Sequence, residues 1–375
     1  MKKIILLIVT IIVMSFSVEF PVYASQDVGL LEDFDFTEID DSLASIFPEE
    51  KLDFKDTVMQ IISGKLDLTG ALLNRLVKEQ VSYAFGSCKS NLIHMLLLAL
   101  MTALFSNFTN VFQNKQISEV SFYMLYLMII ALALNSFQIV TSWVGDGVNT
   151  LSGFMSVFCP VYFVAVSVAK GSVTAVAFYN LILFVIYLVE VIIGKLLLPV
   201  IHVYIMIRIL NHLSEEDYLS KFAELLEMLV SWILKMFVAG IVGINLVQGL
   251  INPAIDTVKR SAITRGAEAI PGIGDALGGT AEVLLGTAVL IKNGIGMAGA
   301  VICFSLCLVP VVQVALIVLM YKLSAAVIQP VADKRVVGCL ESVAEGCRLL
   351  LRVIFTIGLL FLLTIVIVAT LTNAV

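Results

Sequence analysis

The stretch VSFYMLYLMIIALALNSFQIVTSWVGDGVNTLSGFMSVFCPVYFVAVSVA, residues 120–169, contains a single charged residue, Asp146. A helix needs about 20 predominantly apolar residues to cross the hydrocarbon core of a membrane, and a charge inside that core is costly. The segments before and after Asp146 are each long enough to cross. The stretch therefore predicts two membrane-spanning helices joined by a turn at residues 142–147.

The composition of the whole chain agrees with a membrane protein. Of its 375 residues, 60% are hydrophobic and 14% are charged, and the mean hydropathy is +1.03. Soluble globular proteins average roughly 45–50% apolar and about 25% charged residues. These values exclude ordinary soluble and disordered proteins. The net charge of −6, with no basic cluster, predicts no nucleic-acid partner.

Further uncharged runs give the number of crossings. They cover residues 90–114, 171–189, 236–255, 293–321 and 353–375, with a shorter run at 196–207. We therefore predict an all-α, polytopic helical bundle with seven to nine spans in the lipid bilayer, formed by residues 90–375. The positive-inside rule places Lys115 and Lys170 on the cytoplasmic side, and residues 142–147 outside. Between 171 and 210, either two crossings or one crossing with a re-entrant half fits the pattern.

The N-terminus has the layout of a secretory signal peptide. Lys2 and Lys3 precede an apolar stretch, and Val22-Tyr23-Ala24 is a small-residue cleavage pattern. We expect cleavage between Ala24 and Ser25, which makes residues 1–24 the signal peptide. An uncleaved anchor helix is the alternative.

An acidic extracytoplasmic leader follows at residues 25–57, with aromatic and aliphatic residues between its carboxylates. The favoured interpretation is a solvated leader, and the alternative is a segment that folds on a partner through its aromatic residues. Residues 58–89 form an amphipathic helical segment, expected on the outer membrane surface or against neighbouring subunits.

Residues 269–296 are rich in glycine and contain Pro271. Irregular backbone at membrane depth is either buried in protein or lines a cavity, as in transporters, so this is a candidate pore or packing segment; an ordinary loop is the alternative. Its candidate residues are Pro271, Gly272, Gly274, Asp275, Gly278, Gly279 and Glu282. The Gly-x-Gly-Asp match at 272–275 also suggests an intramembrane aspartyl protease. The second membrane aspartate that such an enzyme needs is missing, so this alternative is remote.

Two ionisable residues within an apolar run, Glu190 and Lys195, are candidates for an intramembrane function. Their i,i+5 spacing is poor for a contact within an α-helix. For Lys195, Lys235 and Lys292 the simpler expectation is that the ammonium groups extend to the membrane surface.

Catalytic, cofactor and metal motifs are lacking. The six cysteines contain no C-x-x-C pair, the three histidines are scattered, and there is no Walker loop or hydrolase motif. We therefore predict no enzyme activity, no cofactor and no metal. Small-residue pairs at 239/243, 294/298 and 296/300 predict close helix packing, either within one bundle or in a homo-oligomer. Residues 322–350 include an amphipathic stretch, interpreted as a cytoplasmic surface helix or a partner-docking helix.

Three segments carry a resemblance to a known family. They are AIPGIGDALGGTAEVLLGTAVLIKNGIG at 269–296, LVP at 308–310 and YKLSAAVIQPVADKR at 321–335. The chain resembles the stage III sporulation protein AE family of endospore-forming bacteria. The resemblance implies a structural or conducting membrane subunit of the channel complex that joins the mother cell to the forespore. It also implies the outer forespore membrane as the location, and ring-forming and other membrane subunits as partners. It supplies no active-site residues. A secondary transporter for a small molecule is the alternative function.

Overall fold

The computed structural model describes residue 31, residues 34–46 and 53–63, scattered positions between 85 and 101, and residues 115–170, 172–212, 218–268, 274–330 and 332–371. In some stretches, chiefly 115–119, 248–268 and 274–285, it describes the backbone alone. Every regular element in these ranges is a helix. The predicted signal cleavage site, Ala24 and Ser25, lies outside the described residues.

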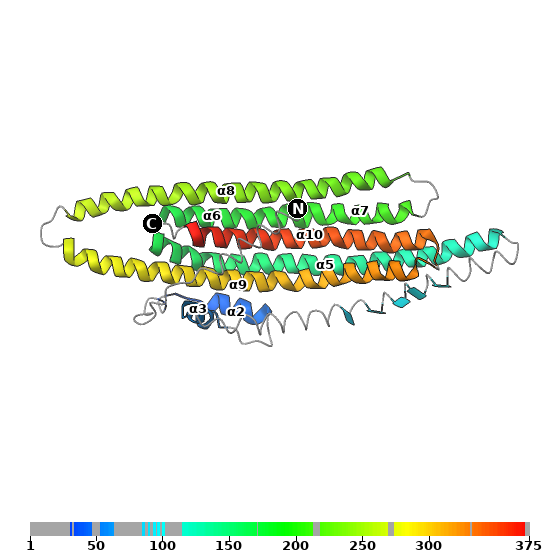
Figure 1. Ribbon diagram of the computed structural model, residues 1–375, viewed down its shortest axis with the longest axis horizontal. Helices are drawn as coiled ribbons and strands as arrows, with labels where there is room; N and C mark the ends of the chain where they lie inside the picture. The colour runs from blue at the N-terminus through cyan, green and yellow to red at the C-terminus, as the bar shows by residue number, and fades with distance from the viewer. Residues whose placement is uncertain are drawn as a thin grey trace.

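Long antiparallel helices lying side by side make up the bundle (Figure 1). They are α5 (Lys115–Lys170), the continuous rod α6 (Ser172–Leu188), η2 (Val189–Leu197) and α7 (Leu198–Asn211), then α8 (Ser220–Glu268), α9 (Gly274–Ile328) and α10 (Lys334–Leu371). Within the described residues, five helical stretches are long and apolar enough to cross a membrane. The prediction of an all-helical, multi-pass membrane protein is confirmed.

The predicted run at 90–114 lies largely outside the described residues, so the predicted seven to nine spans stay a prediction. The two spans predicted on either side of Asp146 form a single helix, α5. It continues through 142–147, where a turn was predicted, and Asp146 lies on its exposed side. Gly147 has a packing role instead, because a Cβ atom there would lie 2.9 Å from Cγ of Pro310 in α9. The predicted turn is therefore wrong. Lys115 and Lys170 begin and end this single helix, so they lie at opposite ends of the bundle, whereas the prediction put them on one side.

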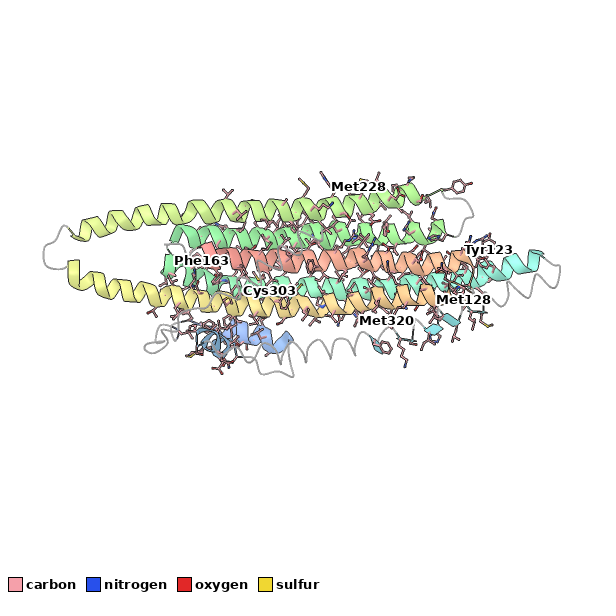
Figure 2. The ribbon with its side chains drawn as sticks, viewed as in Figure 1. Tyr123, Met128, Phe163, Met228, Cys303 and Met320 are labelled. Carbon is pink, nitrogen blue, oxygen red and sulfur yellow. The ribbon has the colours of Figure 1, made fainter. Side chains whose placement is uncertain are left out.

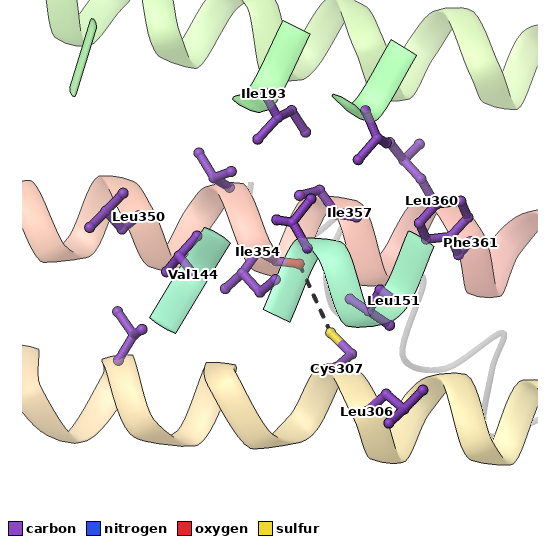
Figure 3. Close-up of a cluster of buried hydrophobic side chains, with 14 of the residues drawn as sticks. Val144, Leu151, Ile193, Leu306, Cys307, Leu350, Ile354, Ile357, Leu360 and Phe361 are labelled. Atoms are coloured by element: carbon purple, nitrogen blue, oxygen red, sulfur yellow. Dashed lines mark hydrogen bonds between the residues drawn. The ribbon is translucent and has the colours of Figure 1, made fainter. Parts of the chain in front are cut away.

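Helix α10 occupies the centre of the bundle. It packs against α9, α5, α7 and α8. Figure 3 shows the apolar core around it, where the thiol of Cys307 in α9 donates to the carbonyl oxygen of Ile354 in α10 over 3.9 Å. Gly358 permits this approach, since any Cβ there would collide with Cys307.

The stretch 322–350 does not form a surface helix. Helix α9 continues to Ile328, and the amphipathic residues form the first half of α10. The apolar face predicted for docking is buried in the bundle of this same chain, at Val336, Val337, Leu340, Val343, Ala344 and Cys347.

The described part of the acidic leader is folded against the bundle. Helix α2 (Thr37–Ile46) and helix α3 (Phe54–Ile62) are joined by the carboxylate of Asp40, which accepts the backbone N–H of Phe54 at 2.8 Å. Phe36, Phe54 and Val58 are buried. The ring of Phe54 lies 6.3 Å from that of Phe158 in α5. A solvated leader does not describe these residues, because the aromatic side chains dock on the chain's own helices.

Glycines of α9 receive large side chains from its neighbours. A Cβ at Gly294 would lie 2.7 Å from Ile62 of α3, and one at Gly296 would lie 2.7 Å from the hydroxyl oxygen of Tyr162 in α5. Gly299 faces the ring of Phe158 even more closely. The predicted small-residue packing at 294 and 296 therefore operates inside the chain.

Candidate functional site

A row of charged side chains crosses the bundle from α8 over α10 to α9. We call it the charged seam and define it as Glu227, Lys322, Glu345, Arg348 and Arg352. All five residues lie in helices that are apolar enough to cross a membrane. Ionisable residues in such segments are rare and mark functional positions by default.

On the α8 side, the carboxylate of Glu227 approaches two guanidinium groups of α10. Its oxygen lies 3.6 Å from Arg348 and 3.8 Å from Arg352. Arg352 also donates to the hydroxyl of Ser231 at 3.3 Å. One helical turn separates the two arginines on α10, so both reach the same face of α8.

On the α9 side, Glu345 of α10 is the linking residue. It pairs with Arg348 on its own helix and with Lys322 of α9, whose nitrogen lies 3.3 Å away. Because α8 and α9 do not form a packed pair in the described part of the chain, α10 connects them through these ions. Three cations face two carboxylates, so the seam carries net positive charge.

The side chains of the seam are partly exposed and not fully buried. Exposed fractions run from 19% for Glu345 to 51% for Lys322. Ion pairs with this exposure contribute about 0–1 kcal/mol each. The seam therefore does little for stability, and its arrangement suits a polar contact across the bundle. The sequence signal for the seam is the helical spacing of Glu345, Arg348 and Arg352. Their partners on α8 and α9 could not be assigned from the sequence.

The second unusual feature is η2, a π-helix of nine residues in the middle of the apolar rod α6–η2–α7. Long π-helices are rare, and short ones are frequent at functional sites. The backbone N–H of Leu198 donates to the carbonyl oxygen of Ile193, five residues earlier. Pro199 follows directly, and a proline ring clashes with the carbonyl four residues before it, here that of Lys195. The wider π turn moves that carbonyl away.

The π-helix changes the relation between Glu190 and Lys195. Their i,i+5 spacing is unfavourable in an α-helix, whereas a π turn closes after five residues and brings both side chains toward one face. Both side chains are exposed. No ion pair joins them to each other or to any other residue that the structure describes.

Lys292 differs from the expectation for lysines at helix ends. Its side chain is fully buried in α9, and the ammonium group donates to the carbonyl oxygen of Ala369 at 3.4 Å, in the last turn of α10. A cation at this position is favourable because the last carbonyls of a helix carry partial negative charge. The expectation that Lys292 extends to the membrane surface is wrong. Lys235 is exposed on α8.

The glycine-rich candidate segment is only partly described. Pro271 and Gly272 lie outside the described residues, and the side chains of Asp275 and Glu282 are not described either. From Gly274 onward the backbone is regular helix, including Gly278 and Gly279. Irregular backbone was predicted up to residue 296, and for 274–296 this is wrong. The role of the segment in a pore or in packing stays a prediction. It starts α9, whereas Glu190 and Lys195 lie in η2, so the structure does not bring the two candidate sites into one element.

No group of three or more His, Cys, Asp or Glu residues in the described ranges could hold a metal ion. The five described cysteines are free and buried.

Comparison with known proteins assigns the family. The model of the family "Stage III sporulation protein AE" matches residues 52–372. A curated relative, "Stage III sporulation protein AE" of Bacillus subtilis (strain 168), is 24% identical over 332 residues, which cover 88% of this chain and 82% of the relative. No solved structure matches. The family description names a sporulation stage and no reaction. The chain is a member of the stage III sporulation protein AE family, with a role in sporulation.

Proposed function

We propose that this chain is a membrane subunit of the mother cell–forespore channel complex that endospore development requires, and that it is a structural or conducting component. Family membership supports the sporulation role. The observation that favours a conducting part is the charged seam, because it sets five ionisable side chains in helices that are long and apolar enough to cross a membrane.

The proposed orientation follows from the ends of the bundle. Lys334 and Arg335 begin α10 at one end, and α3 packs on Gly294 toward the other (Figure 1). The positive-inside rule then puts the start of α10 in the mother-cell cytoplasm. The leader would face the space between the two forespore membranes, where ring-forming subunits of the complex would meet it.

The test is made in the sporulating host. Deleting the gene should cause a large fall in heat-resistant spores, and normal spore numbers would refute the proposal. Replacing Glu227 by Arg puts a third cation beside Arg348 and Arg352, and should lower both spore yield and ion conductance of the purified protein in planar bilayers. The matched control is Lys221→Met, which removes an ion pair with Glu224 at 3.0 Å on the same helix, outside the seam.

A transporter remains the second candidate, favoured by the charged π-helix within a candidate span. Purified protein in liposomes should then move a small solute, and Glu190→Gln should slow the flux. Flux that is unchanged in this variant would remove Glu190 from the site, and absence of any solute flux would exclude the transporter.

A further inference from the structure

The outward face of η2 combines charge with apolar surface. Glu190 and Lys195 are exposed there. Large apolar side chains of the same rod are exposed nearby in sequence, with 47% of Phe184, 61% of Tyr187 and 46% of Leu196 accessible. The rod is a candidate membrane span. Lipid tails satisfy the apolar side chains of this face but not its two charges.

A partner of opposite charge within the chain is not found among the described residues. The described ion pairs of the molecule lie in the seam and at the start of α8. A surface that covers the η2 face must therefore bring its own cation to Glu190 and its own anion to Lys195.

The spacing of the two charges selects a second copy of this chain. Copies inserted in one membrane share their orientation, so a two-fold axis along the membrane normal places equivalent helices parallel. The π geometry turns Glu190 and Lys195 outward together, about one helical turn apart. Rotation about the two-fold axis places Lys195 of one copy on the same edge of the contact as Glu190 of the other, so each charge is offered its opposite.

We propose that two copies of the chain pack against each other through the outward face of η2, with Glu190 of each copy paired to Lys195 of the other. The contact is isologous, so both ion pairs form or neither does. Tyr187 and Leu196 flank the pairs and exclude lipid from them. This self-association does not depend on the sporulation role, and it is measured on the purified protein.

The experiment measures energy transfer between donor-labelled and acceptor-labelled full-length chains in liposomes. Wild-type chains should transfer, with an efficiency that falls on dilution in lipid. Glu190→Lys makes the face wholly positive and Lys195→Glu makes it wholly negative, so each variant alone should associate about tenfold or more weakly. A mixture of the two variants should recover wild-type transfer, because each of the two contacts then joins a lysine of one variant to a glutamate of the other.

The mixture separates the contact from misfolding, since a misfolded variant is not restored by another variant. Asp146→Lys is the matched control, because it reverses an exposed charge in the span on α5 and should leave transfer unchanged. The proposal is overturned if wild-type chains show no transfer, which would indicate another covering partner or water. Transfer at the wild-type level in either single variant, or a mixture that fails to recover, also overturns it.

Discussion

Helices α9 and α8 both form ion pairs with α10, but the α9 side adds close glycine contacts that the described glycines of α8 do not make. On the α9 side, glycines allow close approach, as at Gly358 beneath Cys307, and Gly299 of α9 itself is covered by Phe158 of α5. On the α8 side, Glu227 and Ser231 contact arginines of α10. Figure 2 shows Met228 of α8 projecting away from the bundle, and 71% of it is exposed.

The difference teaches that the two sides respond to different perturbations. Close contacts between backbones and rings tolerate no added volume, because protein interiors are packed to crystal-like density. Replacing one residue of a partly exposed ion pair costs little stability, although the pair still helps to determine which faces of the two helices meet. We expect the α9 side to determine the stability of the bundle, and the α8 side to move more easily against α10.

The strongest test adds volume on the α9 side. Gly299→Leu would collide with the ring of Phe158, which is stacked between Phe154 and Tyr162 and cannot turn away. We expect a loss of about 3 kcal/mol in the free energy of unfolding, measured by denaturant titration in detergent. Gly243→Leu on α8 is the control, because a Cβ there meets nothing within 4 Å. Equal losses in the two variants would remove the distinction between the sides.

A second test uses the contact between Gly358 and Cys307. Gly358→Ala should cost about 1–2 kcal/mol, because the new methyl group overlaps the cysteine side chain. Adding Cys307→Ala removes the sulfur atom and should recover part of that loss. Thermal unfolding of the single and double variants measures the coupling, and strictly additive losses would contradict the contact.

Smaller effects are expected on the α8 side. Glu227→Gln and Arg352→Met should each change stability by less than about 1 kcal/mol, since both side chains are roughly one-third exposed. A double-mutant cycle in thermal unfolding gives their coupling energy. A coupling above about 2 kcal/mol would mean that the pair is effectively desolvated, and the α8 side would then be as tightly fixed as the α9 side.

The smallest effect is expected in the leader, which belongs neither to the α9 side nor to the α8 side. Hydrogen bonds from the hydroxyl and the N–H of Thr37, at 2.6 and 3.0 Å, lower the pKa of Asp35 from its ordinary value of 3.8. The carboxylate therefore stabilises the start of α2 above that value, and the contribution is lost as the pH falls through the lowered pKa. Asp35→Asn should unfold at a slightly lower temperature than the wild type at pH 7, and this gap should close as the pH falls below the lowered pKa. A gap that widens in acid would contradict this sign.

Helix class and membrane insertion were predictable from the sequence because they depend on composition along the chain. The continuation of the helix through 142–147 could not be predicted. Asp146 and Gly147 suggest a turn, but they fit equally well in one long helix in which Gly147 packs against Pro310. A single sequence does not show which distant residues contact each other. For the same reason the burial of Lys292 against the end of α10 could not be foreseen.

The candidate site was predictable in its residues but not in its geometry. Glu190 and Lys195 stood out as charges in an apolar run, yet α-helical spacing argued against a shared face. The nine-residue π-helix before Pro199 removes that objection. Prolines alone do not predict such a helix, because Pro160 and Pro310 lie inside continuous α-helices.

The packing of α3 on α9 sets an order of events during synthesis. Val58 and Ile62 lie against Gly294, which the ribosome adds about 235 residues later, so at about 5–20 residues per second they wait roughly 10–50 seconds for that surface. During that interval the apolar face of α3 lacks the α9 surface that later covers it. A chaperone that binds exposed apolar segments would therefore meet α3 early and release it when α9 is made.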